Sequence, residues 1–178
     1  DYNFLIDKKR IIELFNILED KSLYFNWSCA GRIDKVLSFE DDFLVWLKNR
    51  GLKFIFFGVE SGSVKILRMI NKGITPDMVF RLNLKLRRLN IEPHFSFMTG
   101  FPNETKSELN KTIKLMALLK KQNSNSIIWK INKYAPFPGS PLYEAAKNNG
   151  FCPPETFEEW QYIDYYNHKL KHKFDFKS

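Results

Sequence analysis

Four apolar segments rich in β-branched and aromatic residues recur along the chain, and each predicts a buried strand. Apolar residues predominate in each segment and are nearly continuous in residues 52–59, as is typical of parallel strands that are covered on both faces. The segments start about 30 to 40 residues apart, which is the length of one strand-plus-helix unit. They span residues 23–29, 52–59, 91–98 and 126–134.

Between these segments, apolar residues recur at helical spacing behind residues that favour helix N-termini. Asp7 precedes one such pattern, Thr75 and Pro76 begin another, and Thr105 with Glu108 has the spacing of a capping box ahead of a third. Further helices are expected from Ser38 to Gly51, from Ser63 to Gly73 with the glycine as a left-handed cap, and from Ser140 to Gly150.

Helices that alternate with apolar strands predict an α/β fold, in which a parallel sheet, open or closed into a barrel, is covered by helices. Ligands of such folds bind at the carboxyl ends of the strands. The strand ends of this chain read SCAGR, GVESGS, FMTGFPNET and YAPFPGS, and all are rich in glycine, proline and small polar residues. A binding site is therefore expected where these segments meet.

Composition indicates one well-cored domain, because the chain has 178 residues of which 44% are hydrophobic. No apolar run approaches the roughly 20 residues that cross a bilayer, so no membrane association is expected. Cys29 and Cys152 are far apart in the chain, which is typical of a reduced, cytoplasmic setting. By themselves they cannot hold a metal cluster, and Cys29 is expected to be a core thiol.

The formal net charge of +8 raises nucleic acid as an acidic partner. Arg81, Lys85 and Arg88 share one face of a predicted helix, but such a stripe is more often a solvated surface. The remaining cations are scattered along the chain. A nucleic-acid role is therefore the less favoured interpretation of the charge.

Glu60 follows directly after a predicted buried strand and lies between Gly58 and Gly62. The glycines would let a ligand approach backbone N–H groups at the start of the next helix. A carboxylate at that position suits ribose hydroxyls or an ammonium group more than a phosphate. The alternative is structural, with Glu60 capping the helix or pairing with Arg32 of a neighbouring strand.

The segment FMTGFPNET offers a second candidate contact. Gly100 and Pro102 predict a tight turn, beside which Met98 and Phe101 could form a flat apolar wall for a nucleobase. An ordinary strand-to-helix turn is an equally favoured alternative. Other chemistry is less well supported, because the three histidines show no metal spacing with carboxylates, and neither a phosphate-binding loop nor a nucleophile elbow occurs.

The order of the motifs is more specific than any one of them. DYNFLIDKKR, FNWSCAGRID, FIFFGVESGS, ILRMINKGIT, FSFMTGFPNET and YAPFPGSPLY follow one another across most of the chain. In this order the sequence resembles the radical S-adenosylmethionine superfamily, most closely its MiaB-like, cobalamin-associated branch. The resemblance implies a partial TIM-like (βα)6 barrel, truncated to about four to five strand–helix units within residues 1–150. Residues 151–178 would then form an aromatic and basic helical extension.

Enzymes of this superfamily, here of the iron–sulfur oxidoreductase type, use a 4Fe-4S cluster to cleave S-adenosylmethionine to methionine and a 5′-deoxyadenosyl radical. The resemblance implies both cofactors for the whole protein, and cobalamin where a cobalamin-binding domain lies upstream. The cluster is held by three cysteines in a CxxxCxxC motif that this chain lacks, and Cys29 and Cys152 cannot replace it. We therefore expect a fragment of a radical enzyme that is inactive on its own.

The resemblance also implies roles for residues at the strand ends. Glu60 and Ser96 would contact the ribose or the amino-acid part of S-adenosylmethionine, and Lys72 would meet its carboxylate. Met98 and Ala135 would pack around the adenine, so that these five residues should line one cavity. The other members of the implied cofactor-binding set are Phe101 beside the adenine, Asp1 and Asn3 near the amino group, Arg32 in the mouth of the barrel, Ser61 and Gly100.

No catalytic residue or metal ligand is predicted within this chain, and the fold does not predict the substrate. The alternative function is a non-catalytic α/β module that binds a nucleotide or RNA, and a purely structural role is compatible with a fragment. An exposed sheet edge would favour pairing between copies of the chain, so a homo-oligomer is a further expectation.

Overall fold

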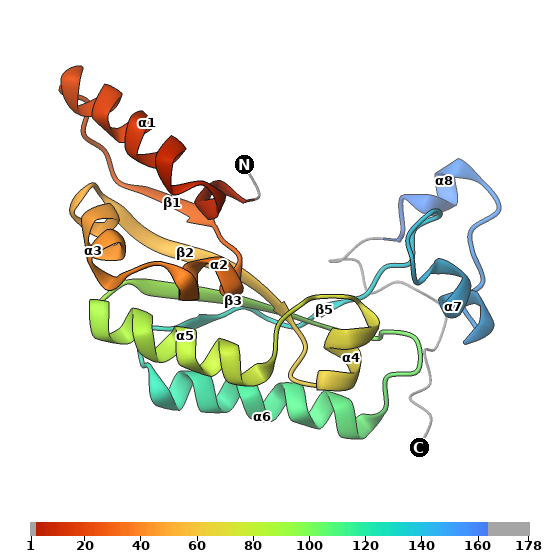
Figure 1. The fold of residues 1–178 in the computed structure, drawn as a ribbon. Coiled ribbons are helices and arrows are strands. Elements are labelled where there is room, and N and C mark those ends of the chain that lie inside the picture. Colours follow the sequence, from red (N-terminus) through yellow and green to blue (C-terminus); the bar gives the residue numbers. More distant parts are fainter. Residues whose placement is uncertain (1–2, 164–178) are drawn as a thin grey trace.

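The computed structural model describes residues 3–163, in which parallel strands form one sheet that is covered by helices (Figure 1). β1 to β4 lie side by side in the order of the sequence, and β5 also pairs with β3. The predicted parallel α/β architecture is therefore confirmed. The strands are β1 (Trp27–Ala30), β2 (Leu52–Glu60), β3 (Glu92–Thr99), β4 (Ile127–Ile128) and β5 (Asn132–Lys133).

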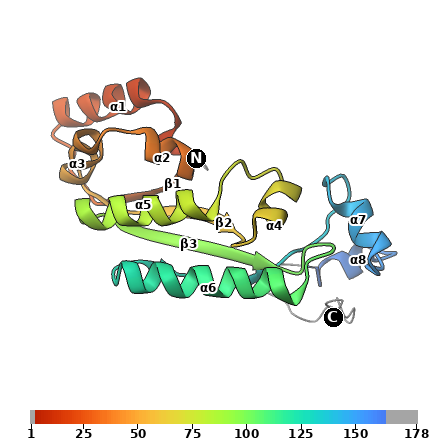
Figure 2. The ribbon, with the colours of Figure 1, turned by 60° about the horizontal axis from the view of Figure 1, so that its bottom comes forward.

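Helices connect successive strands and pack against the sheet. Figure 1 shows α5 and α6 side by side beneath the strands, and Figure 2 shows β3 running between these two helices. The described helices are a short 3-10 helix at Phe4–Ile6, α1 (Lys8–Asp20), α2 (Ile33–Ser38), α3 (Asp41–Asn49), α4 (Val64–Met69), α5 (Pro76–Leu89), α6 (Lys106–Gln122), α7 (Tyr143–Asn148) and α8 (Phe157–Trp160).

Side-chain alternation along β2 and β3 separates a helix-covered face from a second face. Ile55, Phe57 and Val59 of β2 and Phe95 and Phe97 of β3 are fully buried in the main hydrophobic core. The residues between them point to the opposite face of the sheet, which we call the inner face. The inner face consists of Phe54, Phe56, Gly58 and Glu60 of β2 and of Glu92, His94, Ser96 and Met98 of β3.

The first strand is shorter than predicted, because it begins at Trp27 and not at residue 23. The N–H of Trp27 donates to the carbonyl of Gly51, and pairing starts only there. Just before that point the chain crosses Gly51 so closely that a Cβ on the glycine would lie 2.2 Å from the carbonyl oxygen of Phe25. The apolar side chains at residues 23–25 are consequently exposed instead of paired into the sheet.

The segment predicted as one strand over residues 126–134 forms the two short strands β4 and β5. Ile128 pairs with Phe95, and Asn132 pairs with Met98, so four steps along this segment correspond to three along β3. The extra residue interrupts the ladder in the manner of a β-bulge. Trp129 lies at the start of this interruption.

Helix boundaries agree with the predictions where a capping side chain defines them. The N–H of Met78 donates to Thr75 Oγ1 at the start of α5, and Thr105 with Glu108 forms the predicted capping box of α6. The prediction for Ser140 is wrong, because residues 138–142 form turns and α7 begins at Tyr143. The six-residue helix α2 was not predicted, since it is too short to show a helical repeat.

Residues 134–163 pack around a second, small hydrophobic cluster of Ala135, Ala146, Phe151 and Ile163. Within the predicted extension over residues 151–178, the structure describes the single turn of α8, and residues 164–178 lie outside the described part.

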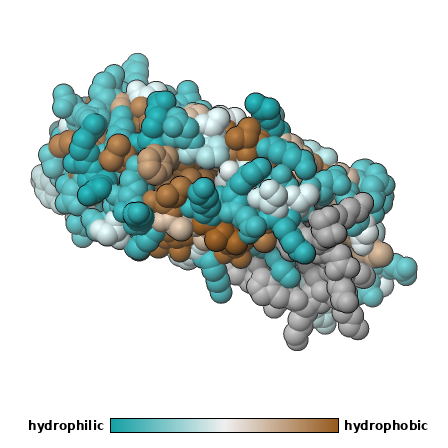
Figure 3. Space-filling view, turned by 90° about the horizontal axis from the view of Figure 1, so that it is seen from below, coloured by the Kyte–Doolittle hydropathy of each residue, from teal (hydrophilic) through white to brown (hydrophobic). Residues whose placement is uncertain are grey.

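Seen from below, the helical surface is mostly hydrophilic with a group of hydrophobic residues near its centre (Figure 3). No helix in residues 3–163 combines the length and the apolar character needed to span a membrane.

Candidate functional site

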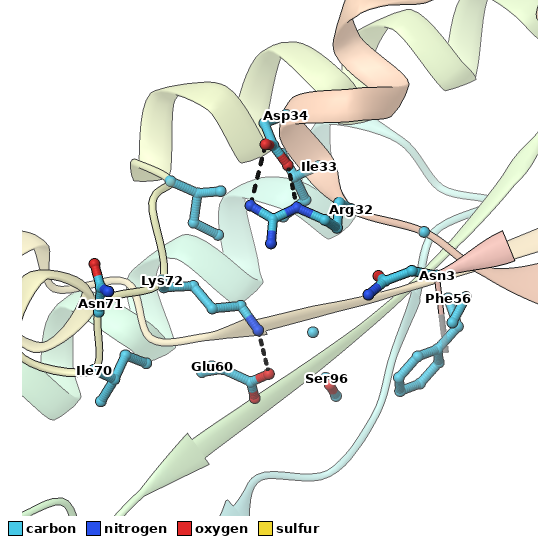
Figure 4. Close-up of a pocket in the computed structure, with 14 residues that line it drawn as sticks. Asn3, Arg32, Ile33, Asp34, Phe56, Glu60, Ile70, Asn71, Lys72 and Ser96 are labelled. Atoms are coloured by element: carbon cyan, nitrogen blue, oxygen red, sulfur yellow. Dashed lines mark hydrogen bonds and ion pairs between the residues drawn. The ribbon is translucent and has the colours of Figure 1, made fainter. Parts of the chain in front are cut away.

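A cavity of about 430 Å³ opens at the carboxyl ends of β1, β2 and β3 (Figure 4). Its walls come from the inner face of the sheet, from the start of α2 and from the turn that follows α4. The volume lies within the range of about 300–1,000 Å³ that is usual for small-molecule sites. Its charged lining residues are Arg32, Asp34, Glu60 and Lys72.

Glu60 reaches the cavity through an irregularity at the end of β2. The pairing of β2 with β3 shifts register between Gly58 and Glu60, and Glu60 has a left-handed backbone with φ of 69°. Such a conformation is uncommon for a residue other than glycine and is found where surrounding structure imposes it. As a result the Glu60 carboxylate folds back over Gly58 instead of continuing along the strand.

Lys72 faces Glu60 because of the way in which α4 ends. Asn71 has a left-handed φ of 50°, the N–H of Asn71 donates to the carbonyl of Arg68, and the N–H of Lys72 donates to that of Leu67. These two bonds form a Schellman motif, which reverses the chain direction. Gly73 has the predicted left-handed backbone, with φ of 71°, but the cap of α4 lies two residues earlier, where Asn71 supplies that conformation.

The two side chains form an ion pair inside the cavity. Lys72 Nζ donates to Glu60 Oε1 at 2.8 Å, and the side chains are 31% and 19% exposed, respectively. Figure 4 shows the lysine extending from the turn after α4 toward the carboxylate. Partial burial makes such a pair stronger than one on an open surface, because water screens it less.

Arg32 and Asp34 form a second ion pair at the opposite wall. Arg32 Nε and Nη2 donate to the two carboxylate oxygens of Asp34 at 3.0 and 3.1 Å. These hydrogen bonds lower the pKa of Asp34 below its usual value and raise the pKa of Arg32. Arg32 therefore pairs with Asp34, and the structural alternative of an Arg32–Glu60 pair is not what the structure contains.

The turn after β3 is organised by a carboxylate that the sequence analysis did not single out. Oε2 of Glu104 accepts hydrogen bonds from Thr99 Oγ1 at 2.9 Å and from the N–H groups of Gly100 and Phe101 at 2.6 and 3.4 Å. Glu104 is only 4% exposed, and burial raises its pKa above the usual value. A glycine in the predicted turn, Gly100, and a carboxylate four residues later were the signal that the sequence offered for this contact.

Of the five residues expected to line one cavity, the structure brings three together. Glu60, Lys72 and Ser96 line it, and so do Asn3 and Arg32 of the wider predicted set. Figure 4 shows Ser96 beside Glu60 on the inner face. The two strands thus present these residues to the same space, as a shared binding role requires.

The residues predicted to surround the adenine lie outside this cavity. Phe101 is buried and stacks on Tyr134 with ring centroids 5.3 Å apart, and Ala135 is buried in the second hydrophobic cluster. Met98 and Gly100 belong to the end of β3 and its turn and do not line the cavity.

Ser61 is also away from the cavity, because it is fully buried and its hydroxyl is hydrogen-bonded to that of Thr112 at 3.1 Å. Asp1 lies outside the described residues. The binding roles implied for these residues stay predictions.

Neither cysteine belongs to a set of metal ligands in the described part of the chain. No group of three or more histidine, cysteine, aspartate or glutamate side chains within residues 3–163 could hold a metal ion. Cys29 packs against the main core, and burial raises its pKa to about 12. Cys29 is therefore a protonated thiol at neutral pH, and its packing against the core agrees with the core thiol that the sequence predicted.

The sequence model of the radical SAM superfamily matches residues 2–116. An uncharacterized methyltransferase of Pyrococcus horikoshii is 30% identical over 172 residues, which cover 97% of this chain and 36% of that protein. A tRNA-2-methylthio-N(6)-dimethylallyladenosine synthase of Wolbachia pipientis subsp. Culex pipiens is 36% identical over 92 residues, which cover 51% of this chain and 20% of that protein. This chain thus spans about a third of the length of the first relative and a fifth of the second.

Two solved structures have a similar fold. Coproporphyrinogen III oxidase from Escherichia coli, described as a radical SAM enzyme, matches 80% of this chain and 31% of its own with a TM-score of 0.59 and 19% identity. The radical S-adenosylmethionine methyltransferase TsrM from Kitasatospora setae, with tryptophan and a SAM analog bound, matches 86% of this chain and 30% of its own with a TM-score of 0.59 and 16% identity. At these identities the likeness shows the fold alone, and it confirms the predicted partial TIM-like barrel.

Proposed function

This chain belongs to the radical S-adenosylmethionine superfamily, and from that membership we propose that its cavity binds S-adenosylmethionine as part of a radical enzyme that transfers a methyl or methylthio group. One observation carries the proposal for the cavity itself. Its two cations, Arg32 and Lys72, are matched by two carboxylates, Asp34 and Glu60, so that the four formal charges cancel.

A site with a cation and a carboxylate side by side suits a ligand that is a zwitterion. The amino-acid part of S-adenosylmethionine carries an ammonium and a carboxylate, which need an acceptor and a cation close together. Glu60 supplies the acceptor and Lys72 the cation, and their charged atoms are already 2.8 Å apart. The ammonium and carboxylate of the ligand would exchange with this ion pair, so that the site offers a partner to each of these two charges.

The remaining lining residues fit the nucleoside part of the same molecule. Ser96 offers a hydroxyl for hydrogen bonding, and Phe56, Ile70 and Ile74 offer apolar surface. When bound, S-adenosylmethionine supplies the cleavable sulfonium centre on which the chemistry of the superfamily depends. The residues of this chain would bind that group, orient it and exclude water from it, which is a task of positioning.

The alternative of a nucleotide- or RNA-binding module is less well supported by the same observation. Phosphate groups call for an excess of cations or for backbone N–H groups at a helix start. Here Asp34 and Glu60 would lie against such an anion, and their charge offsets that of Arg32 and Lys72.

The 4Fe-4S cluster that the superfamily implies does not fit the described residues. No suitable ligand set occurs within residues 3–163, and the whole chain has two cysteines, whereas such a cluster takes its ligands from cysteine thiolates in larger number. We therefore derive no step through a cluster, and we expect the chain by itself to bind the cofactor without cleaving it.

The reaction class rests on the relatives. The protein whose match covers 97% of this chain is named an uncharacterized methyltransferase, and the shorter match is named a tRNA-2-methylthio-N(6)-dimethylallyladenosine synthase. Both names indicate group transfer, so transferase describes the proposed activity better than the oxidoreductase type. A structural neighbour with cobalamin and a [4Fe-4S] cluster bound supports cobalamin as a further cofactor of the whole protein.

Calorimetric titration of the chain with S-adenosylmethionine and, separately, with ATP tests the proposal. We expect S-adenosylmethionine to bind one to one and ATP to bind at least tenfold more weakly. Glu60→Gln keeps the size of the side chain but removes its charge, and it should weaken S-adenosylmethionine binding by about 10- to 100-fold. ATP binding as tightly as S-adenosylmethionine, or an unchanged affinity in Glu60→Gln, would contradict the proposal.

A further inference from the structure

Four aromatic side chains gather on the inner face beside the cavity. Phe54 and Phe56 come from β2, His94 comes from β3, and Trp129 follows β4. The imidazole of His94 lies flat on the ring of Phe54, with centroids 4.0 Å apart and an interplanar angle of 8°. Trp129 is near both His94, at 6.1 Å, and Phe56, at 6.0 Å. We call these four residues the aromatic platform.

The platform differs from the aromatic core on the other face of the sheet in its exposure. Phe57 and Phe95, which face the helices, are fully buried, whereas Trp129 is 50% exposed. Phe54 and Phe56 are half-buried. His94 is buried. A large apolar ring that stays in contact with water is unfavourable by itself, so Trp129, Phe54 and Phe56 have ring surface available to a ligand.

The platform and the cavity are continuous. Phe56 lines the cavity together with Glu60 and Ser96, and its ring is also in edge contact with that of Trp129. The Glu60 carboxylate folds back over Gly58, which follows Phe56 by two residues on the same face of β2, about 7 Å away at the usual rise per residue. Figure 4 shows Phe56 on the inner face, with Ser96 between it and Glu60. A ligand on the platform would therefore adjoin a cofactor held at Glu60 and Lys72.

The platform also contains a polar edge. Nε2 of His94 lies 2.5 Å from Oε1 of Glu92, whereas Nδ1 is buried without a hydrogen-bond partner among the described residues. Rings that present a flat apolar face and a polar edge are the common partners of such a surface.

From these contacts we infer that the platform binds a planar aromatic ring of the substrate, of the size of an indole or a purine. The inference rests on the proposed function, because it places the substrate ring next to bound S-adenosylmethionine on the same face of the sheet. The ring belongs either to a free small molecule or to a nucleoside, because both can stack on the aromatic platform. Trp129 supplies the largest exposed surface, so it should contribute most to binding.

The experiment titrates indole, adenosine and, as a non-planar control, cyclohexanol into the chain with saturating S-adenosylmethionine present, while NMR follows the tryptophan indole N–H signals. Trp129→Leu assigns the Trp129 signal by its loss. We expect indole or adenosine to shift that signal and cyclohexanol to leave it unchanged. Trp129→Leu should weaken binding of the planar probes about tenfold and leave the affinity for S-adenosylmethionine unchanged. Binding of adenosine alone would identify a nucleoside, and binding of indole alone a free ring compound.

Trp160→Leu is the matched control, since Trp160 stacks on Phe137 in the C-terminal segment. The inference is overturned if cyclohexanol binds as well as the planar probes, if Trp129→Leu and Phe56→Leu both leave probe binding unchanged, or if S-adenosylmethionine displaces the probes. That last result would assign the platform to the adenine of the cofactor. A repeat of the titration without S-adenosylmethionine separates failure of this inference from failure of the proposed function.

Discussion

A Cβ atom on Gly58 would lie 2.3 Å from Oε1 of Glu60 and 3.1 Å from Nζ of Lys72. The absence of a side chain at Gly58 therefore makes room for the ion pair that defines the cavity. The backbone of Gly58 is not in the left-handed region, so the constraint concerns side-chain space and not conformational freedom. The carboxylate and the glycine two residues before it act as one unit.

Gly58→Ala should consequently weaken S-adenosylmethionine binding by about tenfold or more, because the new methyl group displaces the Glu60 carboxylate from Lys72. Methylthioadenosine lacks the amino-acid part and should bind the variant and the unmodified chain equally well. Calorimetric titration with both ligands measures the difference. Equal weakening for both ligands would instead mean that the methyl group simply fills the cavity.

The double variant Gly58→Ala with Glu60→Asp is the control for this explanation. Aspartate is one methylene shorter, so its carboxylate clears the added methyl group. We expect the second substitution to restore part of the affinity that the first one removes. A double variant that binds more weakly than Gly58→Ala would contradict the positioning role of Gly58.

Lys72→Met tests the cation of the same pair. Methionine keeps an apolar stem of similar length but cannot donate to a carboxylate, so S-adenosylmethionine binding should fall by about 10- to 100-fold. Lys65→Met is the matched control, because Lys65 is more than half exposed and its Nζ lies beside Asn103 and Glu108, outside the cavity. If both variants bind alike, the Lys72 charge is not part of the site.

The sequence predicted the layers of this fold better than it predicted the convergence of side chains. β2 and β3 have the predicted extents to within one residue, because helices cover one of their faces and the positions on that face are apolar. Thr75 and Thr105 begin helices as expected, since capping is a local interaction. Strand ends were therefore found correctly, and with them the location of the cavity.

The Glu60–Lys72 pair could not be derived from local patterns in the same way. It depends on the register shift after Gly58 and on the left-handed conformation of Asn71, which turns Lys72 back toward β2. The position of Trp129 on the inner face was not predicted either. A run of β-forming residues does not show where the extra residue between β4 and β5 lies. Both features arise from how neighbouring segments align, which a single sequence does not specify.

Glu104→Gln tests the carboxylate that holds the turn after β3. Burial raises the pKa of Glu104 above the usual 4.5, so the folded protein holds this proton more tightly than the unfolded chain does. The contribution of Glu104 to stability is then fully present below pH 4.5 and is lost as pH rises through the raised pKa. The stability of the unmodified chain relative to Glu104→Gln should therefore fall as pH rises from 4.5 through the raised pKa, and it should stay level at higher pH.

Urea unfolding of both proteins between pH 4 and pH 8 measures this difference, with the glutamine variant as the titration-free reference. Glu104→Ala, which removes the acceptor for Thr99, Gly100 and Phe101, should be less stable than Glu104→Gln by about 1–3 kcal/mol at every pH. A stability difference between the unmodified chain and Glu104→Gln that stays constant with pH would show that Glu104 keeps an ordinary pKa.

Asn83 joins α5, α6 and the connection to β4 through a buried network. Its Nδ2 donates to the carbonyl of Leu119 at 3.0 Å and to Gln122 Oε1 at 2.6 Å, and its Oδ1 accepts from Asn123 Nδ2 at 3.3 Å and from Ser126 Oγ at 2.6 Å. Asn83 and Ser126 are fully buried. Asn83→Ala would leave the Ser126 hydroxyl buried without this acceptor and should lower the free energy of unfolding by about 2–4 kcal/mol.

Asn149→Ala is the matched control for this network, because Asn149 makes one side-chain bond, to the carbonyl of Ala145 at 2.7 Å, and is not fully buried. Its loss should cost less than about 1 kcal/mol, which urea midpoints resolve. The network holds the outer helices together and makes no contact with the cavity, so Asn83→Ala should not change the affinity of the folded fraction for S-adenosylmethionine. A selective loss of affinity in that variant would instead mean that packing between α5 and α6 controls the positions of Glu60 and Lys72.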